Sequence, residues 1–137
     1  MNYKKVTVFC AASKNCDKVY LDEAEKLGKM LAQTGREIIY GGGKIGLMGS
    51  LADGALLEGG KITGIIPEFL NDLELGHDGI TELREVKSLH ERESQMLLKT
   101  DCIIALPGGI GTFSELLQAI TWKRLCQINS KIIIVNI

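Results

Sequence analysis

A glycine-rich turn that could bind a phosphate group lies between Pro107 and Glu115. It reads Pro-Gly-Gly-Ile-Gly-Thr-Phe-Ser-Glu, and it joins a strand pattern at residues 101–106 to a helical pattern. Backbone amides at a helix N-terminus have no partner within the helix, so they can bind a phosphate-sized anion. Thr112 could add a hydroxyl donor. The alternative is a capping box, Thr-x-x-Glu, in which Glu115 would only bond backbone amides.

A second glycine-rich turn, residues 41–49, contains the pattern G-x-G-x-x-G from Gly41 to Gly46. It also lies between a strand pattern and a helical pattern, where glycines let backbone amides approach a phosphate. An NAD site is disfavoured, because this turn follows the second strand and the acid at the required distance, Glu68, follows a proline. A purely structural turn is the other alternative. Two such turns at the carboxyl ends of parallel strands predict a phosphorylated small molecule, most simply a nucleotide.

Charged residues interrupt the apolar face of the helix predicted from residue 88, which opens with a capping-box spacing. Three residues spaced by seven and eight define this face: Leu89, Met96 and Leu97. Arg92 and Glu93 fall on the same stripe, where charges are unfavourable unless they are paired or face water. Arg92 could bind phosphate or ribose oxygens; alternatively, both side chains reach the surface or pair at a subunit interface. We expect His90 to be a surface or capping residue.

Strand and helix patterns alternate along the whole chain. Strands are predicted at residues 6–10, 37–40, 62–66, 82–86, 101–106 and 131–136. Helices are predicted at residues 19–34, 47–58, from 88 onward and at 112–126, and residues 68–79 read as a loop with one helical turn. Near-continuous apolar strands alternating with helices predict an α/β fold, a doubly wound, Rossmann-like parallel sheet. We expect residues 1–137 to form a single nucleotide-binding domain.

Composition and net charge argue against several classes of function. The 137 residues carry 16 Lys+Arg and 17 Asp+Glu, a net charge of −1, which predicts neither nucleic-acid nor membrane binding. Four cysteines lack C-x-x-C spacing and only two histidines accompany them, which disfavours a zinc site: Cys10, Cys16, Cys102 and Cys126. With neither a signal sequence nor a membrane span evident, we expect a cytoplasmic protein.

The helix predicted at residues 112–126 is apolar on nearly all sides. One sheet cannot cover two apolar faces, so we predict a homodimer. The chain ends at Ile137, directly after the last predicted strand. A helix normally covers such a strand, so we expect a sheet face near this end to be open or covered by a partner subunit.

Taken together, these segments resemble the Lonely Guy family, formerly described as lysine decarboxylases. The resemblance covers essentially the whole chain, and Pro-Gly-Gly-x-Gly-Thr-x-x-Glu is its most specific motif. The other matching segments are residues 8–13, 40–43, 46–49, 64–67, 90–92 and 121–122.

The resemblance implies a Rossmann-like dimer that hydrolyses the N-glycosidic bond of adenine-type nucleoside 5'-monophosphates, such as cytokinin ribosides, to free base and ribose 5-phosphate. Arg92 and Glu115 would be catalytic, since a carboxylate can stabilise an oxocarbenium-like state and orient water. The 5'-phosphate would bind at Gly108, Gly109, Ile110, Gly111 and Thr112. The nucleotide pocket would include Ser13, Gly42, Gly43 and Met48. No metal and no organic cofactor is implied.

The chain departs from the family pattern at several positions. Glu93 stands where the family usually has lysine beside the arginine, Gln118 where many members have a second acid, and Ala11 where glycine is common. Members usually continue beyond the last strand into a terminal helical segment, which would be absent here. Glu93 and the early end motivate an alternative hypothesis, a nucleotide-binding protein without hydrolase activity, like the related molybdenum-cofactor carriers.

Overall fold

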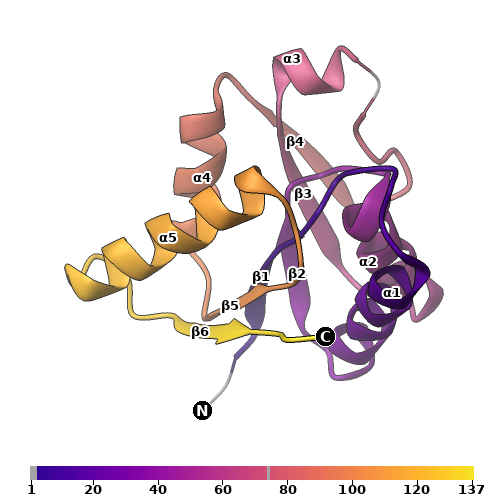
Figure 1. Cartoon of the computed structure of the whole chain (residues 1–137), viewed down its shortest axis with the longest axis horizontal. Coiled ribbons are helices and arrows are strands. Elements are labelled where there is room, and N and C mark those ends of the chain that lie inside the picture. The colour runs from indigo at the N-terminus through magenta and orange to yellow at the C-terminus, as the bar shows by residue number, and fades with distance from the viewer. Residues whose placement is uncertain (1–2, 74) are drawn as a thin grey trace.

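The computed structural model describes residues 3–73 and 75–137, and it forms one six-stranded parallel sheet (Figure 1). The spatial order of the strands is β4-β3-β2-β1-β5-β6. Their bounds are Lys5–Phe9 (β1), Glu37–Tyr40 (β2), Ile62–Pro67 (β3), Glu82–Val86 (β4), Cys102–Ala105 (β5) and Lys131–Ile134 (β6). The parallel strands and the helices between them confirm the predicted doubly wound α/β fold.

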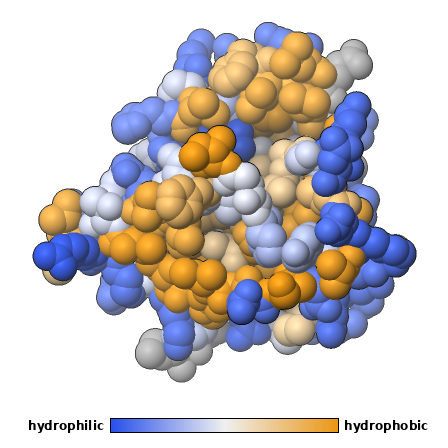
Figure 2. Space-filling view, viewed as in Figure 1, coloured by the Kyte–Doolittle hydropathy of each residue, from blue (hydrophilic) through white to orange (hydrophobic). Residues whose placement is uncertain are grey.

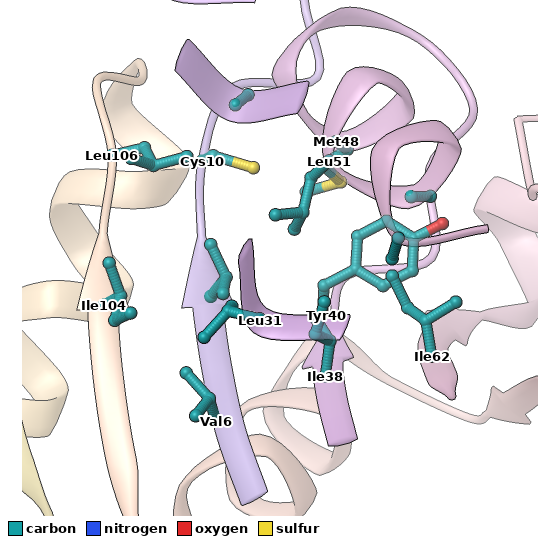
Figure 3. Close-up of a cluster of buried hydrophobic side chains, with 14 of the residues drawn as sticks. Val6, Cys10, Leu31, Ile38, Tyr40, Met48, Leu51, Ile62, Ile104 and Leu106 are labelled. Atoms are coloured by element: carbon teal, nitrogen blue, oxygen red, sulfur yellow. The ribbon is translucent and has the colours of Figure 1, made fainter. Parts of the chain in front are cut away.

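Helices cover both faces of the sheet. Their bounds are Lys18–Gln33 (α1), Gly46–Leu57 (α2), Glu68–Asn71 (α3), Leu89–Leu98 (α4) and Ile110–Arg124 (α5). One core joins the sheet to α1 and α2, and Figure 3 shows its side chains around Ile38, Tyr40 and Leu51. A second core, around Phe9, Ile103 and Met96, joins the opposite face to α4 and α5. Burial on two faces explains why the central strands are almost continuously apolar.

The direction of winding changes between β1 and β5. From β1 the chain builds outward through β2, β3 and β4, and it then returns to place β5 and β6 on the other side of β1. Val6 pairs with Cys102 and Phe9 with Ala105, so both strands end together at one edge. Open α/β sheets bind ligands outside the carboxyl ends of the strands at such a switch point.

Most predicted element boundaries agree with the structure. Gly35 has a φ of +74° just after α1, as expected for a helix C-terminus. The Ser88 cap before α4 is confirmed, since the Ser88 hydroxyl accepts a hydrogen bond from the Glu91 amide at 3.1 Å, while the Glu91 carboxylate accepts from the Lys87 amide at 2.8 Å rather than from that of Ser88. The predicted loop at residues 68–79 contains the single short helix α3, while Glu74 lies outside the described residues, as do residues 1–2.

Two expectations about the helices were wrong. Leu89 does not belong to the inward face of α4, because it is 55% exposed, whereas Arg92 is buried beside Met96 and Leu97. The last helix begins at Ile110 rather than at Thr112. In the described part of the chain, no helix has the length and apolar character needed to cross a membrane.

Candidate active site

Backbone hydrogen bonds join three loops at the carboxyl edge of the sheet. The Ala11 amide donates to the Pro107 carbonyl at 3.2 Å, and the Met48 amide donates to the Ala11 carbonyl at 3.0 Å. The loop after β1 is therefore held between the turn that follows β5 and the start of α2. Gly46 permits this close approach, because a Cβ there would lie 2.6 Å from the Ser13 carbonyl oxygen.

A cavity of about 260 Å³ opens between these loops and α4. It is lined by Cys10, Ala11, Ala12, Ser13, Met48, Arg92, Gly109, Gly111, Thr112 and Glu115. Seven of the predicted site residues thus come together from four separate segments of the chain. A neighbouring cavity of about 300 Å³ shares Ala11, Ser13 and Gly109 and adds Gly108 to its lining. Together the two cavities are of the size that small-molecule ligands occupy.

The N-terminus of α5 presents unpaired backbone amides to this cavity. Gly109 is the N-cap and has no side chain to satisfy them, and the first intrahelical bond is donated by Phe113 to the Gly109 carbonyl at 3.1 Å. The amides of Ile110, Gly111 and Thr112 precede that bond, so they are free to bind an anion. The capping-box interpretation is therefore wrong, because Thr112 lies inside the helix.

Glu115 and Arg92 are the two charged residues that line the cavity, and each is only 9% exposed. Glu115 lies on the inward face of α5 with Thr112 and Ala119, rather than on a solvated stripe. Among the described residues, the two groups make no direct ion pair, yet each influences the other. Burial raises the pKa of Glu115 to about 7, although Arg92 lowers it, and Glu93 adds a further rise.

The Arg92 guanidinium remains positively charged in this setting. Burial lowers its pKa below the usual value, and the charges of Glu115 and Glu93 oppose that shift. The cavity therefore contains a fixed cation and a carboxyl group that is close to half ionised at neutral pH. Such a carboxyl group can exchange protons with a bound ligand or with water.

The first glycine of the triplet makes room for Arg92. A Cβ on Gly41 would lie 2.7 Å from Arg92 Nη2 and 3.2 Å from the Met48 sulfur. Cys10 and Met48 lie at one end of the core drawn in Figure 3, which places their side chains beneath the cavity. Gly41, Cys10, Ala11 and Ala12 were not among the predicted site residues. Their position at the carboxyl ends of β2 and β1 was the available signal.

Four predicted residues do not line this cavity; Gly108 lines only the neighbouring one. A Cβ on Gly42 would face Leu83 and Ile66, so Gly42 belongs to the packing of β3 and β4. Gly43 packs against the Met48 side chain, and its carbonyl accepts a hydrogen bond from the Tyr40 hydroxyl at 2.9 Å. The Ile110 side chain is 84% exposed, so only its backbone faces a ligand.

His90 is exposed, as expected. Within residues 3–73 and 75–137, no three His, Cys, Asp or Glu side chains gather closely enough to hold a metal ion.

Comparison of the sequence with known proteins shows to which family the chain belongs. Residues 48–137 match the family described as "Possible lysine decarboxylase". The chain is also 40% identical over 134 residues to the cytokinin riboside 5'-monophosphate phosphoribohydrolase of Rhodococcoides fascians, covering 97% of this chain and 68% of that protein. The chain belongs to the Lonely Guy family. Phosphoribohydrolases of the same name from rice (Oryza sativa subsp. japonica) and Arabidopsis thaliana are each 42% identical across 90% of this chain.

This Lonely Guy chain covers 51% of the rice relative and 54% of the Arabidopsis relative. Among solved structures, a molybdenum cofactor carrier protein from Chlamydomonas reinhardtii superposes with a TM-score of 0.80 at 22% identity, covering 97% of this chain and 76% of that one. A molybdenum cofactor binding protein from Rippkaea orientalis gives 0.79 at 22% identity, with coverage of 99% and 79%. At this identity, the two structures show the shared fold alone.

Proposed function

We propose that this chain hydrolyses the N-glycosidic bond of adenine-type nucleoside 5'-monophosphates, cytokinin riboside 5'-monophosphates among them. The products are the free base and ribose 5-phosphate. One observation carries the proposal: a buried carboxyl group, Glu115, lines the same cavity as a buried guanidinium and a set of free helix amides. The names of the family relatives agree with this reaction.

The N-terminus of α5 provides the site for the 5'-phosphate. Its unpaired amides and the positive end of the helix dipole favour a phosphoryl group beside Gly109, Gly111 and Thr112. Arg92, which lines the same cavity, adds a fixed positive charge and can hold phosphate or ribose oxygens in one orientation. With the phosphate held there, the ribose lies within the cavity that Glu115 lines.

Glu115 acts on the bond between ribose C1' and the base nitrogen. As that bond breaks, positive charge develops on the sugar, and an ionised carboxylate stabilises it. Glu115 also takes a proton from the attacking water, whose oxygen forms the new bond to C1'. The leaving base nitrogen gains one proton, so the products balance. A pKa of about 7 leaves a substantial fraction of Glu115 ionised at neutral pH, as this role requires.

The decisive assay follows base release from AMP and from isopentenyladenosine monophosphate by chromatography. We expect release from at least one of them, and we expect Glu115→Gln to reduce kcat by about 100-fold or more. Glu58→Gln is the matched control, because Glu58 is exposed at the far end of α2. Nucleotide binding without base release would favour the carrier alternative, and full activity in Glu115→Gln would exclude the proposed chemistry.

We also propose that two copies associate through α5. Its exposed stripe is apolar, at Ile110, Phe113, Leu117 and Ile120, and Figure 2 shows hydrophobic residues gathered over this helix. Four free thiols agree with action in a reducing compartment such as the cytoplasm. The net charge of −1 gives no reason to expect nucleic-acid or membrane partners.

A further inference from the structure

A second and larger cavity, of about 540 Å³, lies on the α4 side of the sheet. Its floor comes from β1, β2, β3 and β4, and one wall comes from the C-terminal half of α4. It shares no lining residue with the candidate active site. Its volume falls in the range typical of small-molecule sites.

The floor of this cavity is apolar except for one hydroxyl. Ile39, Thr63 and Ile65 form it; Ile39 pairs with Thr63 in the sheet, and Ile65 lies two residues further on the same face. Thr63 is 3% exposed, and no partner for its hydroxyl exists among the described residues. On the same face, the Thr7 hydroxyl donates to the Met96 carbonyl at 2.8 Å. Since no buried side-chain polar atom in the described chain lacks a partner, the Thr63 hydroxyl is accessible from the cavity and can bind a ligand atom there.

Positive charge gathers at one end of the cavity. Lys5 and Lys99 line it, and neither side chain is ion-paired within the described chain. They lie close together, because the hydroxyl of Thr100, the residue after Lys99, donates to the Lys5 carbonyl at 3.1 Å. The one acidic residue in the lining, Glu37, already has a lysine partner, Lys61, at 3.6 Å.

Arg84 lies at the opposite end of the cavity. Its guanidinium donates to the Gln95 side chain and to Glu82, each at 3.2 Å, which ties β4 to α4. Leu98, which is 56% exposed, adds apolar surface on the α4 wall. The cavity crosses from β1 to β4, which is three strand spacings or about 14 Å. The cavity is therefore elongated, with an apolar floor between polar walls and a cationic end.

We infer that this cavity is a second binding site, for a small organic anion with an apolar body. The anionic group lies between Lys5 and Lys99, the apolar body covers Ile39 and Ile65, and a polar atom of the ligand pairs with the Thr63 hydroxyl. The inference does not depend on the proposed hydrolase activity, since the two cavities have separate linings. It predicts that the chain binds such an anion and a nucleotide at the same time.

The test uses 8-anilinonaphthalene-1-sulfonate, which joins a sulfonate to an apolar aromatic body and fluoresces in apolar sites. We expect saturable binding to the full chain that persists in excess AMP. Lys5→Gln combined with Lys99→Gln should weaken the affinity by about tenfold. Leu98→Trp should abolish this binding by filling the cavity, whereas Leu57→Trp, at a 68% exposed leucine on α2, should leave it unchanged.

Three results would overturn the inference. The first is absent binding, or binding that is unaffected by Leu98→Trp. The second is displacement of the probe by AMP, which would place it in the candidate active site. The third is a change in molecular mass by light scattering for Leu98→Trp but not for Leu57→Trp, which would make this face a contact between copies of the chain. Thr63→Val retains the shape of the floor, and it should weaken binding without changing the unfolding midpoint of the free protein appreciably.

Discussion

At the residue scale, Glu93 is expected to shift the pH dependence of the reaction. Burial is the main cause of the raised pKa of Glu115; Arg92 lowers that pKa, and the charge of Glu93 raises it further. The third titratable neighbour, Cys10, is buried with a pKa well above its usual range and stays neutral. Glu93→Gln should therefore lower the pKa of Glu115. If ionised Glu115 is the active form, the ascending limb of kcat/KM against pH moves to lower pH.

Glu93→Lys, which introduces the residue expected from the family resemblance, should move that limb further in the same direction. The measurement is a pH–rate profile of base release from AMP for the three proteins. Glu58→Gln, which changes the same charge far from the site, should leave the profile unchanged. Coincident profiles for Glu93→Gln and the unmodified chain would show that Glu93 has no influence on Glu115.

Glu115 should also make the free energy of unfolding depend on pH. Its pKa is raised from 4.5 to about 7 in the folded chain, so the folded state holds this proton more tightly than the unfolded state. Stability is therefore greatest below pH 4.5 for this group, and it falls as the pH rises toward 7. The loss amounts to about 3 kcal/mol once the carboxyl group is fully ionised.

Glu115→Gln has the shape of the neutral acid and avoids this loss. At pH 8 the variant should be more stable than the unmodified chain by about 2–3 kcal/mol, and near pH 4.5 the two should be equal. Urea denaturation at a series of pH values measures the difference. A constant difference across this range would mean that the Glu115 carboxyl group is not held in a desolvated position.

At the scale of elements, hydrophobic periodicity was enough to predict the sheet and most helices. The starts of helices were harder, and α5 shows why. Its glycine run offers several possible first residues, and a start at Thr112 would make Glu115 a capping residue. The observed start at Ile110 turns Glu115 inward instead. A difference of two residues in where α5 begins thus decides whether Glu115 caps the helix or faces the cavity.

The candidate site was predictable only where local sequence determines it. The free amides of α5 follow from the glycine motif and its position after a strand. The approach of Arg92 to Gly41 could not be predicted, because it depends on how α4 packs against the end of β2. For the same reason, sequence alone did not show which glycines of the triplet face the cavity.

Gly46 joins the loop after β1 to the start of α2. It has a φ of +67°, and a Cβ there would meet backbone atoms of Ala11, Ala12 and Ser13 at 2.6–3.0 Å. Gly59 is a matched control, since it has a φ of +65° and a Cβ there would meet no atom within 4 Å. Alanine at either position costs about 1–2 kcal/mol of left-handed backbone strain.

Gly46→Ala should cost more than Gly59→Ala, because it must also displace the loop that carries Ser13. It should raise the KM for AMP, whereas Gly59→Ala should leave KM unchanged. Thermal unfolding and steady-state kinetics on both variants provide the comparison. Equal effects on stability and on KM would show that the loop moves away from Gly46 without consequence for the site.

At the scale of the whole molecule, the exposed face of α5 leaves large apolar side chains uncovered in a single subunit. The helix buries Thr112, Glu115 and Ala119 against the sheet, while the opposite stripe exposes large apolar side chains. From Ile110 to Ile120 this stripe extends about 15 Å along the helix. Contiguous apolar surface of this kind typically marks a contact with another protein.

A charge in the middle of this stripe should therefore prevent association. Leu117 is 47% exposed, so Leu117→Glu should leave the folded subunit intact while placing a carboxylate in the proposed interface. Light scattering at micromolar concentration should give the mass of a dimer for the unmodified chain and of a monomer for Leu117→Glu. Leu57→Glu, at a 68% exposed leucine on α2, should remain dimeric. A monomeric unmodified chain would refute the proposed interface, and a dimeric Leu117→Glu would locate it elsewhere than on α5.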